Sequence, residues 1–158
     1  MTQDNDQEAR NWAMLCHLSS IVWIPLALLL ALIGIPLPIP FLNIVGPLVV
    51  CLSKKNQHPL IDAHGKESLN FQISLTIYSV IAGIVFLLLI TVTCGIGFSS
   101  SSSTTQSPLV QIGLVLGIAA IVLSLIVGIV QLFLVIFAAI KAKKGEFYHY
   151  PFTLRFLR

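Results

Sequence analysis

Histidine and acidic side chains are the groups in this sequence that could do chemistry, because they exchange protons or bind metal ions near neutral pH. The four histidines are His17, His58, His64 and His149. Asp62, His64 and Glu67 stand close together and could in principle share a metal ion. Their spacing matches no common metal-binding pattern such as H-E-x-x-H on a helix. We therefore expect no metal site and no bound cofactor.

The sequence contains no arrangement of nucleophile, base and orienting group that would catalyse a reaction. The serines of residues 99–103 form a low-complexity run without a base near them. No acidic residue lies between residues 68 and 140. A proton-coupled carrier usually needs one inside the membrane, so this absence argues against an active transporter. We expect no catalytic residues and a protein that is not an enzyme.

Three cysteines, Cys16, Cys51 and Cys94, lie within or beside apolar segments. Their spacing is not that of metal ligands, and nothing in the sequence pairs them as disulfides. We expect single buried thiols that pack as small apolar residues.

The composition indicates a membrane protein. Of the 158 residues, 56% are hydrophobic and 9% are charged, whereas a soluble domain carries roughly 25% charged residues. A chain of this length has too little interior to bury so much apolar surface in water. The lipid bilayer is therefore its expected solvent.

Four apolar segments predict an all-α, polytopic integral membrane protein, a four-helix membrane bundle made of two hairpins. We expect a disordered leader at residues 1–10 and a single membrane domain over residues 11–158. The helices are expected at about residues 12–32, 41–53, 68–98 and 109–140, followed by a tail at residues 141–158.

Prolines predict irregularities in the first hairpin. Pro25 should kink the first helix near Ile21, because it removes one backbone donor. The second element, residues 41–53, would be only about 20 Å long as a helix, less than a full span. Gly46-Pro47 should break it. The stretch Lys54–Glu67 that follows is expected to be a polar loop, with a turn bounded by Pro59 and Gly65.

The third element begins with polar and apolar residues in strict alternation, from Ser68 to Ile77. A strand is excluded, because open sheet edges are not stable in lipid. As a helix, the segment carries two polar rows on different sides, with a spacing of four within each row. These rows are Ser68-Gln72-Thr76 and Asn70-Ser74-Tyr78. We therefore expect neighbouring segments on both sides of this helix.

The fourth element carries one polar side chain and a run of small residues. Gln131 is expected deep in the membrane, where it needs a partner, and the polar rows of the third helix are the candidate. Gly113 and Gly117 form a G-x-x-x-G pair that permits close helix approach. Such an approach serves either packing within the monomer or dimerisation.

Charge predicts the topology. All nine Lys and Arg and all six Asp and Glu fall in residues 1–10, 54–67 and 141–158. Four crossings put these three segments on one side, and the uncharged turns at residues 34–40 and 95–108 on the other. The positive-inside rule makes the charged side cytoplasmic, so both termini are expected there.

The tail after residue 140 is basic and aromatic. Gly145 should end the last helix. Phe147, Tyr148 and Tyr150 are expected at the membrane interface, in a short amphipathic segment that lies on the membrane. The excess of Lys and Arg favours anionic lipid headgroups. Nucleic acid is not an expected partner, because basic tails beside membrane helices are the rule.

Several blocks of the sequence together resemble a widespread family of small bacterial membrane proteins that share a domain of unassigned function. The blocks are Trp12 with His17-Leu18-Ser19, Gly46-Pro47, Lys54-Lys55, His64-Gly65-Lys66-Glu67-Ser68-Leu69-Asn70-Phe71-Gln72, Lys141-Ala142 with Lys144-Gly145-Glu146, and Tyr150-Pro151. That family is similar to the Tic-twenty component of the chloroplast inner-envelope protein translocon. The resemblance covers residues 11–158 and implies four membrane helices, a bacterial inner (plasma) membrane location and, from the plastid members, a role in protein translocation.

Two hypotheses of function follow. The first is a structural or assembly component that associates with itself or with other membrane proteins, in a protein-translocation complex if the resemblance extends to function. The alternative is a channel or facilitator whose polar path is lined by His17, Asn70, Gln72 and Gln131. The candidate positions for function or packing are His17, His64, Lys66, Glu67, Asn70, Gln72, Gln131, Gly113 and Gly117.

Overall fold

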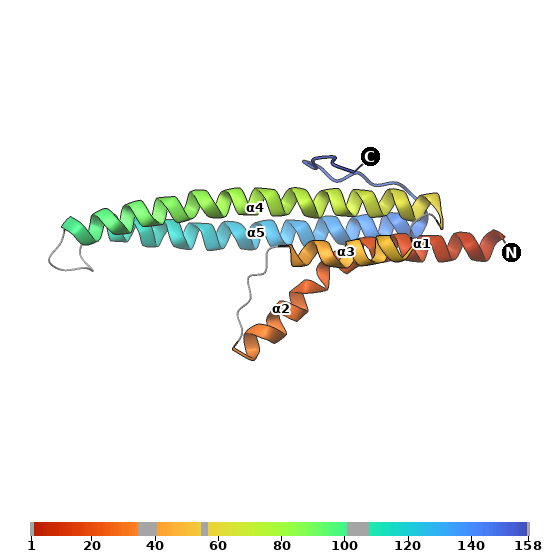
Figure 1. Ribbon diagram of the computed structural model, residues 1–158, viewed down its shortest axis with the longest axis horizontal. Helices are drawn as coiled ribbons and strands as arrows, with labels where there is room; N and C mark the ends of the chain where they lie inside the picture. The colour runs from red at the N-terminus through yellow and green to blue at the C-terminus, as the bar shows by residue number, and fades with distance from the viewer. Residues whose placement is uncertain (1, 35–40, 55–56, 101–107, 158) are drawn as a thin grey trace. The chain divides into compact units, whose positions relative to one another are not determined.

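The computed structural model describes residues 2–34, 41–54, 57–100 and 108–157. Over these residues the chain is helical and has no strand, as the sequence predicts. The elements are α1 (Thr2–Leu18), the 3-10 helix η1 (Ser19–Ile21), α2 (Trp23–Leu32), α3 (Leu42–Ser53), α4 (Pro59–Ser100) and α5 (Pro108–Lys144) (Figure 1). They divide into two compact units: unit 1 comprises Met1–Ile77 with Leu132–Arg158, and unit 2 comprises Tyr78–Gln131.

Within the described residues, two stretches of helix are long and apolar enough to cross a membrane, by length and composition. They are Pro59–Thr93 in α4 and Val110–Lys144 in α5, of 35 residues each. A crossing needs about 20 residues, so both are longer than one bilayer requires. The first predicted span corresponds to parts of α1 and α2, which η1 separates. The second corresponds to the short apolar helix α3. Four crossings therefore stay a prediction.

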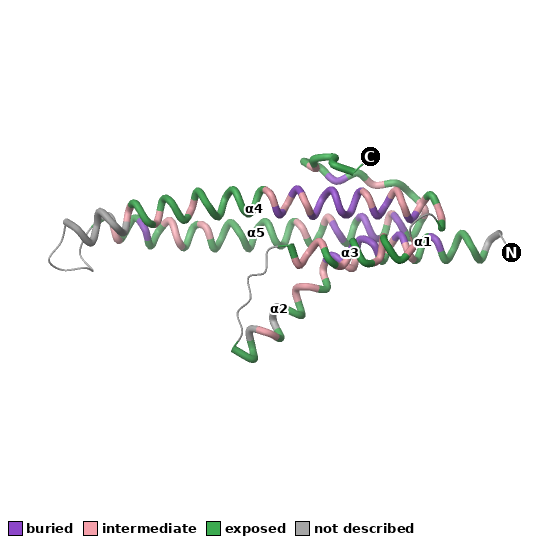
Figure 2. The backbone as a smooth tube through the Cα atoms, in the orientation of Figure 1, coloured by how far each residue is buried: buried purple, intermediate pink, exposed green. Residues whose placement is uncertain are grey.

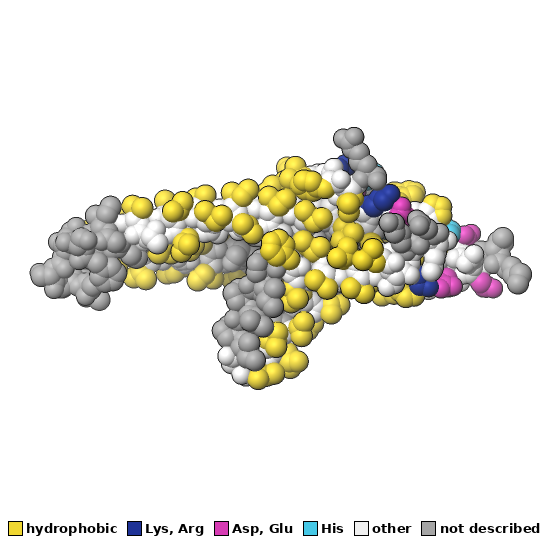
Figure 3. Space-filling view, viewed as in Figure 1, with side chains coloured by type: hydrophobic (Ala, Val, Ile, Leu, Met, Phe, Trp, Pro, Cys, Tyr) yellow, Lys and Arg dark blue, Asp and Glu magenta, His cyan; other side chains and the backbone are white. Residues whose placement is uncertain are grey.

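Unit 2 exposes apolar side chains along both of its helical segments. Leu87 and Leu88 in α4 and Leu114 and Leu123 in α5 are exposed in this way. Figure 2 shows these stretches largely as exposed, and Figure 3 shows hydrophobic side chains along α4. Exposed leucines are unfavourable in water and stable beside lipid tails. Unit 2 is thus suited to the interior of a membrane.

Helices α1 and α2 are separated by η1, close to the kink predicted from Pro25. Two serine hydroxyls of the turn, those of Ser19 and Ser20, donate to the carbonyls of Cys16 and His17 at 3.1 and 2.7 Å. Such local bonds compete with helical ones. Pro25 also offers no N–H to the turn before it. Both features favour a break at this point.

Helix α1 begins at Thr2, so residues 2–10 are helical where we expected a leader without structure. Ala9 is buried and packs with Cys16 and Ile61 in a small core cluster. The Nε1 of Trp12 is 3.2 Å from Glu8 Oε1, and the Lys54 ammonium lies 4.5 Å from the centroid of the Trp12 ring. Contacts with other segments therefore order a stretch whose polar composition gave no sign of structure.

Helix α3 is short, as predicted, but Gly46-Pro47 does not break it. Pro47 lies inside the helix and is buried. Gly46 instead permits close packing, because a Cβ at this position would lie 2.2 Å from the carbonyl oxygen of Ser19. The prediction of a broken second element is wrong, since packing against η1 outweighs the hydrogen bond that Pro47 removes.

Helix α4 begins at Pro59, so most of Lys54–Glu67 is helical rather than the polar loop we expected. Proline suits a first helical position, where its missing N–H would have no partner. Asp62 in the first turn is favoured by the helix dipole. Gly65 does not bound a turn; it lies inside α4 against Cys51, whose Sγ would be 2.2 Å from an added Cβ.

The polar loop expected over residues 95–108 is shorter than predicted. Helix α4 continues to Ser100 and α5 starts at Pro108. The remainder of that prediction, at residues 101–107, falls outside the described residues.

Gly145 ends α5, as predicted, with a φ of +79° that favours glycine. Its N–H donates to the Ala142 carbonyl at 2.9 Å, and the N–H of Glu146 donates to the Lys141 carbonyl at 3.0 Å. These bonds satisfy carbonyls at the helix end. Residues 146–157 then form a non-helical tail that contacts α4.

Candidate functional site

One side of α4 contacts α1 and α3 through polar side chains. Ser68 Oγ donates to the Cys16 carbonyl at 2.9 Å. From α3, Asn43 Nδ2 donates to Gln72 Oε1 at 2.8 Å and to Thr76 Oγ1 at 3.1 Å. All three side chains of the row Ser68-Gln72-Thr76 are buried. This row therefore joins α4 to the N-terminal helices.

Another side of α4 binds the backbone of the C-terminal tail. Asn70 Oδ1 accepts the N–H of Phe156 at 3.1 Å and that of Leu157 at 2.8 Å. Asn70 Nδ2 donates to the Leu157 carbonyl at 3.0 Å. One turn further on, Ser74 Oγ accepts the N–H of Leu154 at 2.8 Å. Two polar side chains thus bind the tail through its backbone.

Glu67 adds a charged contact to the same side. Its Oε1 accepts the N–H of Tyr150 at 2.9 Å, and its Oε2 lies 3.5 Å from Nδ1 of His149. Glu67 is only 9% exposed, and a carboxylate so far from water needs such partners. We call Glu67, Asn70 and Ser74 the tail-binding face.

Tyr150 anchors the tail in the core of unit 1. Its ring stacks on Phe71 with centroids 3.9 Å apart and packs with Val135 and Ala138 of α5. Burial raises the pKa of the Tyr150 hydroxyl well above its ordinary value, so the group keeps its proton. The Tyr150 ring fills a gap between helices, and its hydroxyl has a partner on α1. The level of Tyr150 relative to the membrane interface stays a prediction.

Two buried histidines form a series of hydrogen bonds with this hydroxyl. Tyr150 Oη lies 3.0 Å from His17 Nδ1, and His17 Nε2 lies 3.0 Å from His64 Nδ1. The two histidines are 0% and 1% exposed. A hydrogen bond between two ring nitrogens requires that one of them carries a proton and the other does not. We call this arrangement the Tyr150–His17–His64 chain; it links the tail, α1 and α4.

Five of the predicted positions therefore lie together in unit 1, where they make contacts within the fold. They are His17, His64, Glu67, Asn70 and Gln72. Lys66 lies apart on the surface, where its Nζ is 2.9 Å from Asp62 Oδ2 one turn away. Exposed pairs of this kind contribute about 0–1 kcal/mol.

The remaining predicted positions lie in unit 2. Gln131 is half-buried and Gly113 is buried. At Gly117 an added Cβ would meet nothing within 4 Å. Close helix approach at Gly117 is therefore not seen within the described part of the chain.

Asn43 and Tyr150 belong to the site and were not among the predicted positions. Asn43 is a lone polar residue in an apolar segment, which is a signal that could have indicated a buried partner. Tyr150 gave no comparable signal, because tyrosine is equally common at membrane interfaces.

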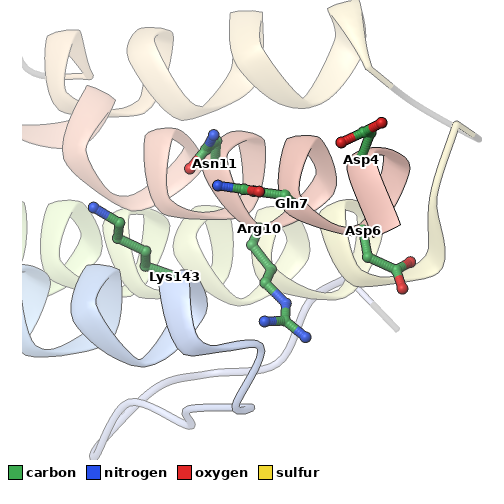
Figure 4. A pocket seen from close by; sticks show the side chains of 6 residues that line it. All are labelled: Asp4, Asp6, Gln7, Arg10, Asn11 and Lys143. Carbon is green, nitrogen blue, oxygen red and sulfur yellow. The ribbon is translucent and has the colours of Figure 1, made fainter. Parts of the chain in front are cut away.

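A surface pocket of about 400 Å³ lies where α1 meets the end of α5. Its lining residues are Asp4, Asp6, Gln7, Arg10, Asn11 and Lys143 (Figure 4). The charges in it are mixed, and it does not adjoin the buried chain of histidines. Among the described residues, no group of three or more His, Cys, Asp or Glu side chains is arranged to hold a metal ion.

Comparison with known proteins gives one family. A family model described as the magnetosome magnetite crystal formation protein family (MamF/MmsF) matches residues 8–157. This is a family of small membrane proteins, as the sequence predicts, and its description concerns crystal formation rather than translocation. Searches of curated proteins and of solved structures gave no match.

Proposed function

Because the chain belongs to the magnetosome magnetite crystal formation protein family (MamF/MmsF), we propose that it is a non-enzymatic membrane protein that serves magnetite crystal formation as a structural or assembly component. It holds a fixed shape in the membrane and associates there with copies of itself or with other membrane proteins.

The observation that carries this proposal is that polar side chains of unit 1 form hydrogen bonds inside the protein. His17 is bound to His64 and Tyr150, and Asn70 is bound to the tail. Polar groups that are buried and hydrogen-bonded to one another rigidify a fold. A solute path needs polar groups that are open to water, so this arrangement supports a scaffold over a channel.

The membrane part of the proposal goes beyond the two long apolar helices. We propose four crossings in a bacterial plasma membrane or in a compartment derived from it, with both termini on the cytoplasmic side. The support is the separation of charged from uncharged segments along the sequence. The apolar surface of unit 2 supports lipid as its surroundings.

The tail supports contact with lipid headgroups. The tail-binding face holds the backbone of the tail, and several side chains of the tail beyond Tyr150 are exposed. Phe152 is 90% exposed, and Arg155 and Phe156 are also exposed. Aromatic and basic side chains together favour a membrane interface with anionic headgroups.

A narrower form of the proposal places the protein in a protein-translocation complex, as the resemblance to the Tic-twenty component implies. Purification from native membranes in a mild detergent, followed by mass spectrometry of the bound proteins, tests it. Translocation components in the complex support the narrower form. The absence of translocation components, with other membrane proteins or further copies of this chain in the particle, leaves the broader form. A strictly monomeric particle without any partner contradicts both.

The broader function is tested in a magnetite-forming bacterium that encodes this protein. Deletion of the gene should change the number or the dimensions of the crystals seen by electron microscopy. The natural gene should restore them, as should a Lys66→Ala variant, whose changed residue lies outside the buried contacts. An Asn70→Leu variant should restore them less well. Crystals that are unchanged in the deletion strain would refute the proposal.

A further inference from the structure

Two cysteines that the sequence leaves unpaired come together in unit 1. Cys16 of α1 is fully buried and Cys51 of α3 is half-buried. Their sulfurs are 3.9 Å apart, and the Cys51 thiol is directed at Cys16. Both are free thiols, as expected. Their proximity was not predicted, because the contact between α1 and α3 is not visible in the spacing of the residues.

A glycine on a third helix makes room for the pair. Cys51 Sγ packs where Gly65 of α4 has no side chain, since a Cβ there would be 2.2 Å from it and 3.8 Å from Cys16 Sγ. Any larger residue at position 65 would displace Cys51. The backbone of Cys16 is fixed in addition by Ser68, which donates to its carbonyl. The two sulfurs are thus held together by contacts from three helices.

We propose that Cys16 and Cys51 are a redox-active pair that closes reversibly to an intramolecular disulfide by exchange with a small-molecule disulfide. Cys51 is the attacking residue, because it is the less buried of the two. Cys16 is the resolving residue, because it is buried beside Cys51 and has no other access. An S–S bond is about 2.05 Å long. Rotation of the two side chains therefore has to shorten the sulfur–sulfur distance from 3.9 Å to that length.

The exchange is balanced in two steps. The Cys51 thiolate attacks one sulfur of the small disulfide, whose S–S bond breaks; one small thiolate leaves and a mixed disulfide forms on Cys51. The Cys16 thiolate then attacks the Cys51 sulfur and expels the second small thiolate. The two protons from the cysteines end on the two released thiols. The protein loses two electrons, and the small disulfide gains them.

The sequence predicts both cysteines in the first two apolar segments, near their cytoplasmic ends. A pair in exchange with the cytoplasmic thiol pool rests as the dithiol. The disulfide forms when the thiol pool is oxidised, and it then ties α1 to α3. This inference concerns the chemistry of the pair and does not depend on the proposed function.

The test uses the full chain in lipid nanodiscs with Cys94→Ser, which leaves only this pair. The protein is incubated with oxidised glutathione, denatured in an alkylating agent and weighed by intact-mass spectrometry. We expect the loss of two hydrogen masses and no alkylation, with both changes reversed by a reductant. Protein that keeps both thiols alkylatable, or that forms disulfides only between chains, would overturn the proposal.

Two further variants separate the roles of the cysteines. Cys16→Ser should accumulate one glutathione adduct on Cys51, because nothing resolves the mixed disulfide. Cys51→Ser should gain no adduct, because Cys16 is buried. An adduct on Cys16 as abundant as that on Cys51 would overturn the assignment of attacker and resolver. Since serine is nearly the size of cysteine, both variants are expected to fold, and circular dichroism checks this.

Discussion

Asn70 on α4 and Leu157 near the C-terminus are joined by two hydrogen bonds of 2.8 and 3.0 Å across 87 positions in the chain. The side-chain amide of Asn70 both accepts from and donates to the backbone of Leu157. An amide is the side-chain group that matches a backbone in this way, since it carries one acceptor oxygen and two N–H donors. A single residue of a long apolar helix thereby fixes the end of the chain.

Substitutions at Asn70 should release the tail in a graded manner. Asn70→Asp keeps an oxygen for the N–H groups of Phe156 and Leu157 but loses the donor to the Leu157 carbonyl. Asn70→Leu loses all three bonds, which contribute about 0.5–1.5 kcal/mol each. Hydrogen exchange of the tail amides, measured by mass spectrometry, should therefore be slowest in the natural protein, faster with Asp and fastest with Leu. Equal protection in all three would mean that other contacts hold the tail.

The polar rows of α4 show how far the sequence could predict this site. Spacing alone indicated polar groups on two sides of one helix, and both sides do contact neighbours. The identity of the second neighbour was not predictable. The tail has no helical periodicity, and it is bound through its backbone, which carries no sequence signal.

Errors in the element boundaries have a common physical origin. Gly46 and Gly65 were interpreted as helix breakers or turn residues, which is the local preference of glycine. In the structure both lie inside helices, where the absence of a Cβ lets another segment approach. Close approach depends on residues that are distant in the sequence, so the residues next to a glycine do not predict it.

The Tyr150–His17–His64 chain should contribute strongly to stability. His17→Phe removes the partner of two buried groups, each of which costs about 1–3 kcal/mol when left unsatisfied. Tyr150→Phe removes one of these bonds and keeps the ring stacked on Phe71, so its effect should be about half as large. Thermal unfolding in detergent, followed by circular dichroism, measures both.

A matched control is His149→Ala, because the side chain of His149 is mostly exposed and makes only a long contact with Glu67. Its unfolding temperature should stay close to that of the natural protein. If His17→Phe behaves in the same way as this control, the buried hydrogen bonds are not a source of stability.

Two glycines should respond in opposite ways to alanine. Gly46→Ala places a methyl group 2.2 Å from the backbone oxygen of Ser19, which has no room to move without shifting η1. Overpacking of this kind costs about 1–3 kcal/mol or more. Gly117→Ala meets nothing within 4 Å and should be neutral or stabilising by up to about 1 kcal/mol, since alanine favours helix.

The same variant distinguishes the two uses left open for the G-x-x-x-G pair. If Gly117→Ala lowers stability or reduces the size of the particle in light scattering, a helix from a second copy packs there. An unchanged particle excludes that contact.

The number of membrane crossings is the last prediction, and it follows from charge and length together. The charge pattern predicts four crossings, whereas in the described part of the chain only α4 and α5 contain stretches long enough to span alone. Alkaline phosphatase fused after Ser100 should be active, because that position lies in the turn at residues 95–108 that is predicted on the far side. Green fluorescent protein fused after Lys144 should fluoresce in the cytoplasm. Phosphatase fused after Leu32 tests the first hairpin. Activity there means that α2 reaches the far side and α3 returns, while inactivity leaves two crossings.

Phosphatase activity after Lys144 would contradict the topology as a whole. Lys141, Lys143 and Lys144 would then lie on the far side, whereas positive residues are retained on the cytoplasmic side.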